Sequence, residues 1–280
     1  MNRRSGAAAR RTTPSSPRPG SAGRRVVVAA VMSSLLVFRV PSSEASTATT
    51  ETLVLRGRPQ TVHVYGARGH GEPVIVSSGD GGWMHLGPHI ADLLAGAGYF
   101  VVGFDVRAYL ESFTSGASSL QPEDVGRDYQ TLAAFASRGA TAKPVLIGVS
   151  EGAGLSVLAA ADARVKSSVA GVIALGLPDI NELGWRWKDA VIYVTHGVPD
   201  EPTFNVSSVI KRIAPLPLAA IHSTSDEFAP LAQAEQLFSL SSEPHKLWVV
   251  KAANHRFSGN MAEFDRRLLD ALVWVRHNQP

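Results

Sequence analysis

The sequence has no cysteine among its 280 residues. This absence excludes a disulfide framework, a metal site built from thiolates and a cysteine nucleophile. It leaves the cellular compartment open, because many exported bacterial proteins also have no disulfides. Any nucleophilic catalysis by this chain therefore has to use another side chain.

The apolar run of residues 26–38 is shorter than a membrane span. It has 13 residues, whereas a membrane-spanning helix needs about 20. The run follows an arginine-rich segment and precedes Ser43–Ala45, which fits a cleavage site of small residues. The sequence therefore predicts a signal peptide or a retained N-terminal anchor over residues 1–45, and export to the periplasm. The pair Arg24-Arg25 permits twin-arginine export. The alternative to a signal peptide is a start codon chosen upstream of the true one.

A strong charge of one sign is absent from the main part of the chain. Residues 1–45 contain eight of the 27 basic residues and one of the 24 acidic residues. The remaining residues include 19 basic and 23 acidic ones, so the formal charge of +3 and the pI of about 9.3 come from the N-terminal segment. A mildly acidic domain binds the phosphate backbone of nucleic acids poorly. We therefore expect no nucleic-acid partner.

Motifs for nucleotides and metals are missing too. The sequence has no G-x-x-x-x-G-K-[ST] segment, so we expect no nucleotide. His85 and His89 are four residues apart, but Pro88 lies between them and no H-E-x-x-H motif is present. We expect neither a metal site nor a cofactor.

The sequence does contain apolar strand patterns that alternate with helical ones, and this alternation predicts an α/β fold. Residues 52–57 and 61–66 alternate apolar and polar side chains, as an antiparallel pair does. Further strands are expected within 73–79, 99–106, 143–150, 168–177, 217–227 and 245–255, with another apolar run at 189–197. Helices are expected at 89–98, 122–138, 151–162, 231–240 and 261–277.

This order predicts a mostly parallel central sheet flanked by helices on both faces. No internal repeat or linker interrupts it, so residues 46–280 are expected to form a single α/β domain. The stretch 178–216 is the least regular part and is a candidate cap over a site.

The segment "GVSEG" (148–152) follows an apolar strand and opens a helix of small residues. In α/β-hydrolases the pattern G-x-S-x-G forms a sharp turn that presents a nucleophilic serine at the top of the sheet. The context predicts that Ser150 is a nucleophile. The alternative is a tight turn with a purely structural role.

The partners of such a serine follow in the order acid, then histidine. Asp226 comes directly after one predicted strand and His255 directly after the last one. His255 would act as the general base, and Asp226 would hold its tautomer. Glu227 and Asp179 are alternatives for the acid, and capping of the final helix is the alternative role of His255. Asp105 is expected to order a loop rather than to take part in the chemistry.

An oxyanion hole needs two backbone N–H groups. One is expected from Glu151, the residue after the serine. The other is expected from Asp80 or Gly81, in the glycine-rich loop "SGDGGW" of residues 78–83.

Residues 74–110 and 122–137 resemble the VirJ/AcvB family of bacterial exported α/β-hydrolases. The Ser-Gly-Asp-Gly-Gly-Trp run (78–83) is the most specific part of the resemblance, which covers roughly residues 70–280. It implies a periplasmic serine hydrolase. For AcvB-type members it implies cleavage of the aminoacyl ester of lysyl-phosphatidylglycerol.

The chain departs from that family beside the serine. The family has an aromatic residue there, as in G-Y-S-F-G, whereas this chain has Val149 and Glu151. The Glu151 carboxylate could pair with an ammonium group of the substrate or face solvent. AcvB-type proteins also carry an additional N-terminal module. Candidate contacts for a lysyl group are Asp80, Glu111, Glu151, Asp200 and Glu227.

Three functions remain in competition at the level of sequence. The first is an exported serine esterase acting on an aminoacylated phospholipid at the membrane surface. The second is a general carboxylesterase resembling dienelactone hydrolase. The third is a periplasmic binding or secretion-assisting protein without catalysis. The sequence leaves the oligomeric state open.

Overall fold

The computed structural model describes residues 48–116, 118–186 and 201–280. Three predictions lie outside the described residues: the signal peptide or anchor of residues 1–45, the apolar run 189–197 and Asp200.

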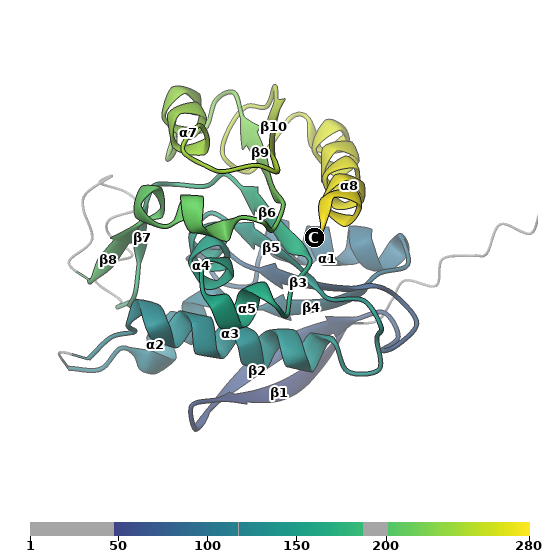
Figure 1. The fold of residues 1–280 in the computed structure, drawn as a ribbon, viewed down its shortest axis with the longest axis vertical. Coiled ribbons are helices and arrows are strands. Elements are labelled where there is room, and N and C mark those ends of the chain that lie inside the picture. Colours follow the sequence, from purple (N-terminus) through teal and green to yellow (C-terminus); the bar gives the residue numbers. More distant parts are fainter. Residues whose placement is uncertain (1–47, 117, 187–200) are drawn as a thin grey trace, which may run out of the picture. The chain divides into compact units, whose positions relative to one another are not determined.

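Within the described residues, an eight-stranded sheet runs in the order β1-β2-β4-β3-β5-β6-β9-β10 (Figure 1). β2 pairs antiparallel with β1 and with β4, and all other neighbours are parallel. The strands are β1 (Thr49–Leu55), β2 (Arg58–Tyr65), β3 (Pro73–Ser77), β4 (Phe100–Phe104), β5 (Val145–Val149), β6 (Gly171–Leu175), β9 (Leu218–Ser223) and β10 (His245–Val250). The predicted antiparallel pair and parallel sheet are confirmed.

Helices cover both faces of this sheet (Figure 1). They are α1 (Leu86–Gly96), α2 (Val106–Phe113), α3 (Pro122–Ala136), α4 (Glu151–Ala160), α5 (Ala163–Lys166), α7 (Leu231–Phe238) and α8 (Met261–Asn278). α1 and α8 pack in one hydrophobic cluster, while α2, α3 and α4 pack in a second cluster against the opposite face. This arrangement follows from right-handed crossovers between parallel strands.

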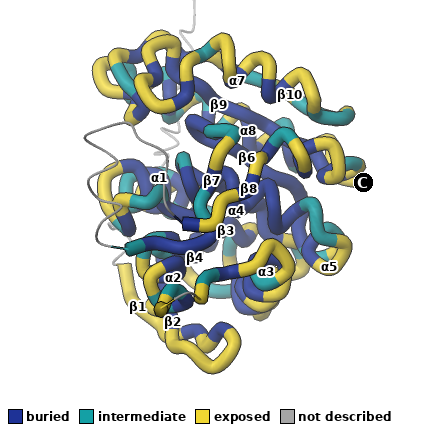
Figure 2. Tube along the Cα trace, turned by 90° about the vertical axis from the view of Figure 1, so that its left-hand side faces the viewer, coloured by how far each residue is buried: buried dark blue, intermediate teal, exposed yellow. Residues whose placement is uncertain are grey.

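The central strands are the most deeply buried part of the sheet. Every residue of β3, β5 and β6 is buried, whereas the first four residues of β1 are exposed (Figure 2). Strands covered on both faces need apolar side chains at every position. Continuous apolar runs in the sequence therefore correspond to the centre of the sheet, and alternating runs to its edge.

Two features differ from the sequence prediction. Asp105 does not merely order a loop, since it is the N-cap of α2, a helix that the sequence analysis missed. The described part of 178–216 is also more regular than expected. It contains an antiparallel pair, β7 (Ile180–Glu182) with β8 (Thr203–Asn205), and short 3₁₀ helices at Val206–Ser208 and Ile210–Ile213.

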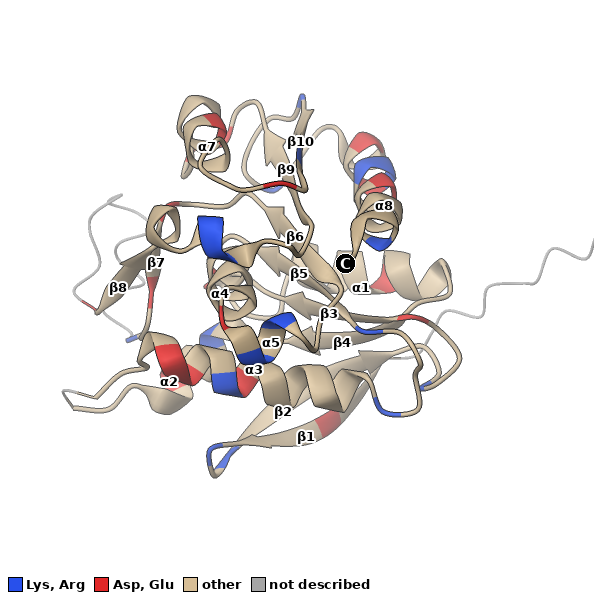
Figure 3. Ribbon diagram, viewed as in Figure 1, with Lys and Arg blue, Asp and Glu red and all other residues tan. Residues whose placement is uncertain are grey.

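Acidic and basic side chains are interspersed on the described surface, for example along α8 (Figure 3). The helices of the described residues include none that is long and apolar enough to cross a membrane.

Candidate active site

Ser150 lies in a sharp turn between β5 and α4. Its φ is 51°, a left-handed conformation that non-glycine residues adopt rarely. The flanking glycines are required, because a Cβ atom at Gly148 would overlap the α4 backbone and one at Gly152 would overlap the backbone of Ser77 and Ser78. The turn thus has the strained geometry of a nucleophile elbow.

Asp226 and His255 are brought together from the ends of β9 and β10. Asp226 Oδ2 lies 2.6 Å from His255 Nδ1, and Asp226 Oδ1 accepts hydrogen bonds from the N–H groups of Phe228 (3.0 Å) and Ala229 (2.8 Å). Burial opposes ionisation of Asp226, but these hydrogen bonds and the His255 charge outweigh it and lower its pKa. The carboxylate can therefore orient the imidazole.

The other nitrogen of this imidazole is the one that could act as a base. His255 Nε2 is buried and has no hydrogen-bond partner among the described residues. With a proton on Nδ1, facing Asp226, Nε2 carries the lone pair. In that tautomer Nε2 can accept a proton from a hydroxyl group that comes within reach.

Several residues that the sequence analysis did not select hold this pair in place. Gly176, directly after β6, has a φ of +58°, and a Cβ atom there would lie 2.5 Å from His255 Cε1. His222 Nε2 lies 2.7 Å from the carbonyl oxygen of Ala229 and 3.6 Å from Asp226 Oδ2. Burial lowers the pKa of His222, which keeps this imidazole neutral. The sequence held a signal for one of these residues only: Gly176 is a glycine that directly follows a buried strand.

The alternative acids have other partners. Glu227 Oε2 accepts a hydrogen bond from the backbone N–H of His255 at 2.8 Å, so it supports the histidine loop. Asp179 accepts hydrogen bonds from Ser207 N (2.7 Å) and Asn205 Nδ2 (3.0 Å), next to β8. The structure therefore pairs His255 Nδ1 with Asp226 and with neither alternative.

The 78–83 loop passes beside the serine. A Cβ atom at Gly79 would lie 3.5 Å from the Ser150 Cβ. Asp80 and Gly81 follow in this loop, and the Glu151 N–H lies at the N-terminus of α4. The three predicted oxyanion donors are thus on the two segments that meet at Ser150. The N–H groups of Asp80 and Gly81 hydrogen-bond the Asp80 carboxyl group, so an oxyanion would have to replace that carboxyl as their acceptor.

Three carboxyl groups, those of Asp80, Glu151 and Glu182, lie close together on this side of the Ser150 turn. Glu151 Oε1 accepts a hydrogen bond from Glu182 N at 2.6 Å, and Glu151 is only 6% exposed. Of the alternatives given for Glu151, the one in which it faces solvent is excluded, because β7 covers it. Burial, with the nearby Glu182 and Asp80 charges, raises the pKa of Glu151 well above its usual range. Burial also raises the pKa of Asp80 to about 6.

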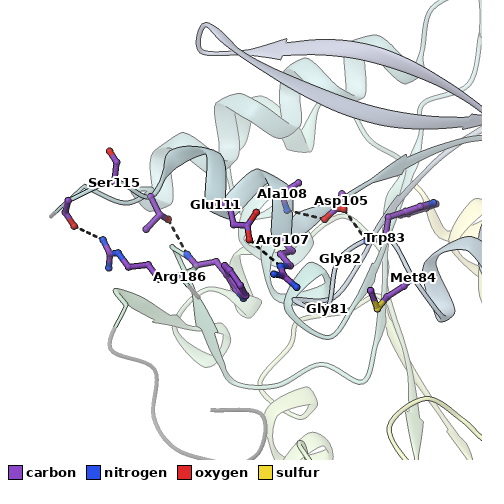
Figure 4. Close-up of a pocket in the computed structure, with 13 residues that line it drawn as sticks. Gly81, Gly82, Trp83, Met84, Asp105, Arg107, Ala108, Glu111, Ser115 and Arg186 are labelled. Atoms are coloured by element: carbon purple, nitrogen blue, oxygen red, sulfur yellow. Dashed lines mark hydrogen bonds and ion pairs between the residues drawn. The ribbon is translucent and has the colours of Figure 1, made fainter. Parts of the chain in front are cut away.

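A groove of about 720 Å³ lies next to the 78–83 loop (Figure 4). Arg107 in this groove pairs with Glu111 at 3.2 Å and lies 4.0 Å over the Trp185 ring. The lining residues are Gly81, Gly82, Trp83, Met84, Asp105, Arg107, Ala108, Glu111, Thr114, Ser115, Gly116, Trp185 and Arg186. The groove is large enough for part of a substrate molecule.

Comparisons with known proteins agree with this architecture. The chain is similar to the α/β-hydrolase GrgF from Penicillium sp. sh18 (16% identity, 83% of this chain and 99% of that chain, TM-score 0.62). It is also similar to a dienelactone hydrolase from Anabaena variabilis (14% identity, 84% and 100%, TM-score 0.57). A third similar structure is the esterase domain of a Rhodothermus marinus protein (18% identity, 82% and 98%, TM-score 0.56).

At the level of sequence, no curated protein matches the chain. The profile of the VirJ family, described as a bacterial virulence protein, matches residues 72–275. That match spans the sheet from β3 to β10 and contains Ser150, Asp226 and His255. The chain has the α/β-hydrolase fold and belongs to the VirJ family of bacterial virulence proteins.

Proposed function

We propose that this protein is an exported serine hydrolase that cleaves carboxylic esters with Ser150, His255 and Asp226. The observation that carries the proposal is the 2.6 Å contact between Asp226 Oδ2 and His255 Nδ1. It engages Nδ1 of His255 with the acid and leaves the buried Nε2 without a partner among the described residues, while Ser150 lies in its strained turn after β5.

The reaction follows from this geometry in two halves. His255 Nε2 accepts the Ser150 hydroxyl proton while the Ser150 oxygen attacks the ester carbonyl carbon. The oxyanion is stabilised by the N–H of Glu151 and by that of Asp80 or Gly81. The alcohol then leaves with the proton from His255. A water molecule, deprotonated by the same nitrogen, hydrolyses the acyl-serine ester and restores the free Ser150 hydroxyl.

We propose further that the acyl part of the substrate carries an ammonium group, as in the lysyl ester of phosphatidylglycerol. Asp80, Glu151 and Glu182 lie together beside the nucleophile turn, and the pKa values of Asp80 and Glu151 are raised. A cation among these carboxyls would favour their ionised form and be attracted by it. Glu111 and Glu227 are weaker candidates for binding the ammonium group. Glu111 already pairs with Arg107, and Glu227 already accepts a hydrogen bond from the His255 N–H.

Such a substrate lies at a membrane surface, which agrees with the predicted export of the chain. The test is release of lysine from vesicles that contain lysyl-phosphatidylglycerol. Purified protein is compared with Ser150→Ala and with Ser167→Ala, which removes an exposed serine on another helix end. We expect release by the wild type and by Ser167→Ala, and none by Ser150→Ala.

The other outcomes separate the competing functions. Cleavage of short p-nitrophenyl esters without lysine release would retain the triad and support a general carboxylesterase. If neither substrate is cleaved and Ser150 is not labelled by a fluorophosphonate probe, the protein is not a serine hydrolase. A binding or secretion-assisting role would then replace the proposed hydrolase function.

A further inference from the structure

The 78–83 loop is held at both ends by the turn that leads from β4 into α2. At its start, Ser78 N donates to the carbonyl oxygen of Phe104 (3.0 Å) and Ser78 Oγ accepts from Val106 N (3.0 Å). At its end, Trp83 N donates to Asp105 Oδ2 (3.1 Å). The loop that carries two proposed oxyanion donors is thus fixed by residues about 22–28 positions away in the chain.

Asp105 connects this loop to a helix with its two oxygen atoms. Oδ1 accepts the N–H of Ala108 (3.0 Å) and caps α2, while Oδ2 accepts the N–H of Trp83 (Figure 4). The N-terminus of a helix favours a carboxylate. The cap therefore holds the carboxylate in a defined place, and the carboxylate holds the loop.

The Trp83 side chain anchors the same end of the loop from the other direction. Its indole stacks on His63, with ring centroids 4.9 Å apart and planes 8° apart. Its Nε1 lies 3.4 Å from the Tyr65 hydroxyl group. Its six-membered ring lies directly over Gly103 of β4, where the Cβ of any other residue would overlap it. Because the indole is packed in this way, the Trp83 backbone N–H is held where it can donate to Asp105.

We infer that Asp105 and Trp83 are positioning residues, which set the N–H groups of Asp80 and Gly81 relative to Ser150. They act through the loop backbone, since Asp105 contacts the loop at the Trp83 N–H. The inference rests on the proposed function, because it assigns oxyanion stabilisation to this loop. It also gives a physical reason for the Gly-Gly-Trp sequence: Gly82, with a φ of +87°, lets the chain turn toward Asp105, and Trp83 locks it there.

The test compares Asp105→Ala and Asp105→Asn with Asp162→Ala. Asp162 caps α5 in the same way, accepting from Arg164 N at 2.9 Å, and it lies outside the 78–83 loop. Steady-state hydrolysis of a p-nitrophenyl ester gives kcat and KM, and a trifluoromethyl ketone serves as a tetrahedral-state inhibitor. Circular dichroism and thermal melting check the fold of each variant.

We expect Asp105→Ala to lower kcat by about 100-fold and to weaken the inhibitor similarly, since loss of one oxyanion donor costs about 10²–10³ in kcat. KM should change by less than about threefold, because ground-state binding does not use the oxyanion hole. Asparagine offers one acceptor oxygen for two N–H groups, so Asp105→Asn should fall between Asp105→Ala and the wild type. Asp162→Ala should melt earlier but keep its kcat.

The remaining outcomes are distinct. A folded Asp105→Ala variant with wild-type kcat and inhibitor affinity would overturn the inference and leave the proposed function intact. An effect confined to KM, or an equal loss of kcat in Asp162→Ala, would also overturn it. An inactive wild type whose Ser150 resists fluorophosphonate would overturn the proposed function, and the inference with it.

Discussion

Asp226 and Glu151 are both 6% exposed, and both follow the carboxyl ends of parallel strands of the sheet. Their pKa values nevertheless shift in opposite directions, down for Asp226 and up for Glu151. Asp226 faces His255 and two backbone N–H groups, whereas Glu151 faces two other carboxyls and one N–H group. Two carboxyls of equally low exposure thus have pKa values that shift in opposite directions, because different groups face them.

The difference assigns separate tasks to the two sides. On the histidine side, the lowered pKa of Asp226 favours a negative charge that would stabilise the imidazolium of the proposed reaction. On the Glu151 side, the carboxyl accepts the Glu182 N–H and so holds β7 against the Ser150 turn. Under the proposed function, a cationic substrate would favour the ionised form of that cluster.

The largest effect should come from removing the charge of Asp226. Asp226→Asn keeps the size of the side chain but permits the wrong His255 tautomer, and we expect kcat to fall by about 10⁴. Ester hydrolysis at pH 7 measures this, with circular dichroism to confirm the fold. A loss below tenfold would mean that Asp226 does not orient the base.

A smaller effect should follow from moving His255 without changing its charge. Gly176→Ala introduces a Cβ atom 2.5 Å from His255 Cε1 at a φ of +58°. We expect about a 100-fold loss of kcat, since a displacement near 1 Å has that cost. Gly96→Ala in α1, where nothing lies within 4 Å, is the matched control and should retain full activity. Equal activities of the two variants would show that the ring tolerates displacement.

The smallest effect should come from Glu151→Gln, which keeps an acceptor for Glu182 N and cannot ionise. We expect hydrolysis of neutral esters within about threefold of the wild type, and about a tenfold loss for ammonium-bearing esters, in line with one charge–charge contact. Glu151→Ala should impair both, because it releases β7. If Glu151→Gln cleaves both ester classes like the wild type, Glu151 does not recognise the cation.

The same variant should alter the dependence of stability on pH. The folded-state pKa of Glu151 lies above its usual 4.5, so its contribution to stability is complete below pH 4.5 and declines as the pH rises toward the folded-state value. Glu151→Gln should therefore gain stability relative to the wild type between pH 5 and pH 8, as measured by urea unfolding. Glu235→Gln, at an exposed position on α7, should show no such gain. A constant difference across this range would contradict protonation of Glu151.

Much of the fold could be predicted from the sequence, because central strands have continuous apolar runs and helices have a 3.6-residue period. α2 was missed because its first residue, Val106, continues the apolar run of β4, so that the expected strand extended to residue 106. The β7–β8 pair was missed because its strands have only three residues each. Ser150, Asp226 and His255 could be selected because each follows a strand, and the carboxyl ends of parallel strands meet at one edge.

The sequence by itself determined the order of strands and helices, the glycines that the serine turn requires and the chain positions of the three proposed catalytic residues. These depend on local sterics and on periodicity. Only the tertiary structure decided that Glu151 is buried against Glu182, that Gly176 touches His255 and that Asp105 holds Trp83. Each of these contacts joins segments more than 20 residues apart, and the pKa of a carboxyl depends on what faces it across that distance.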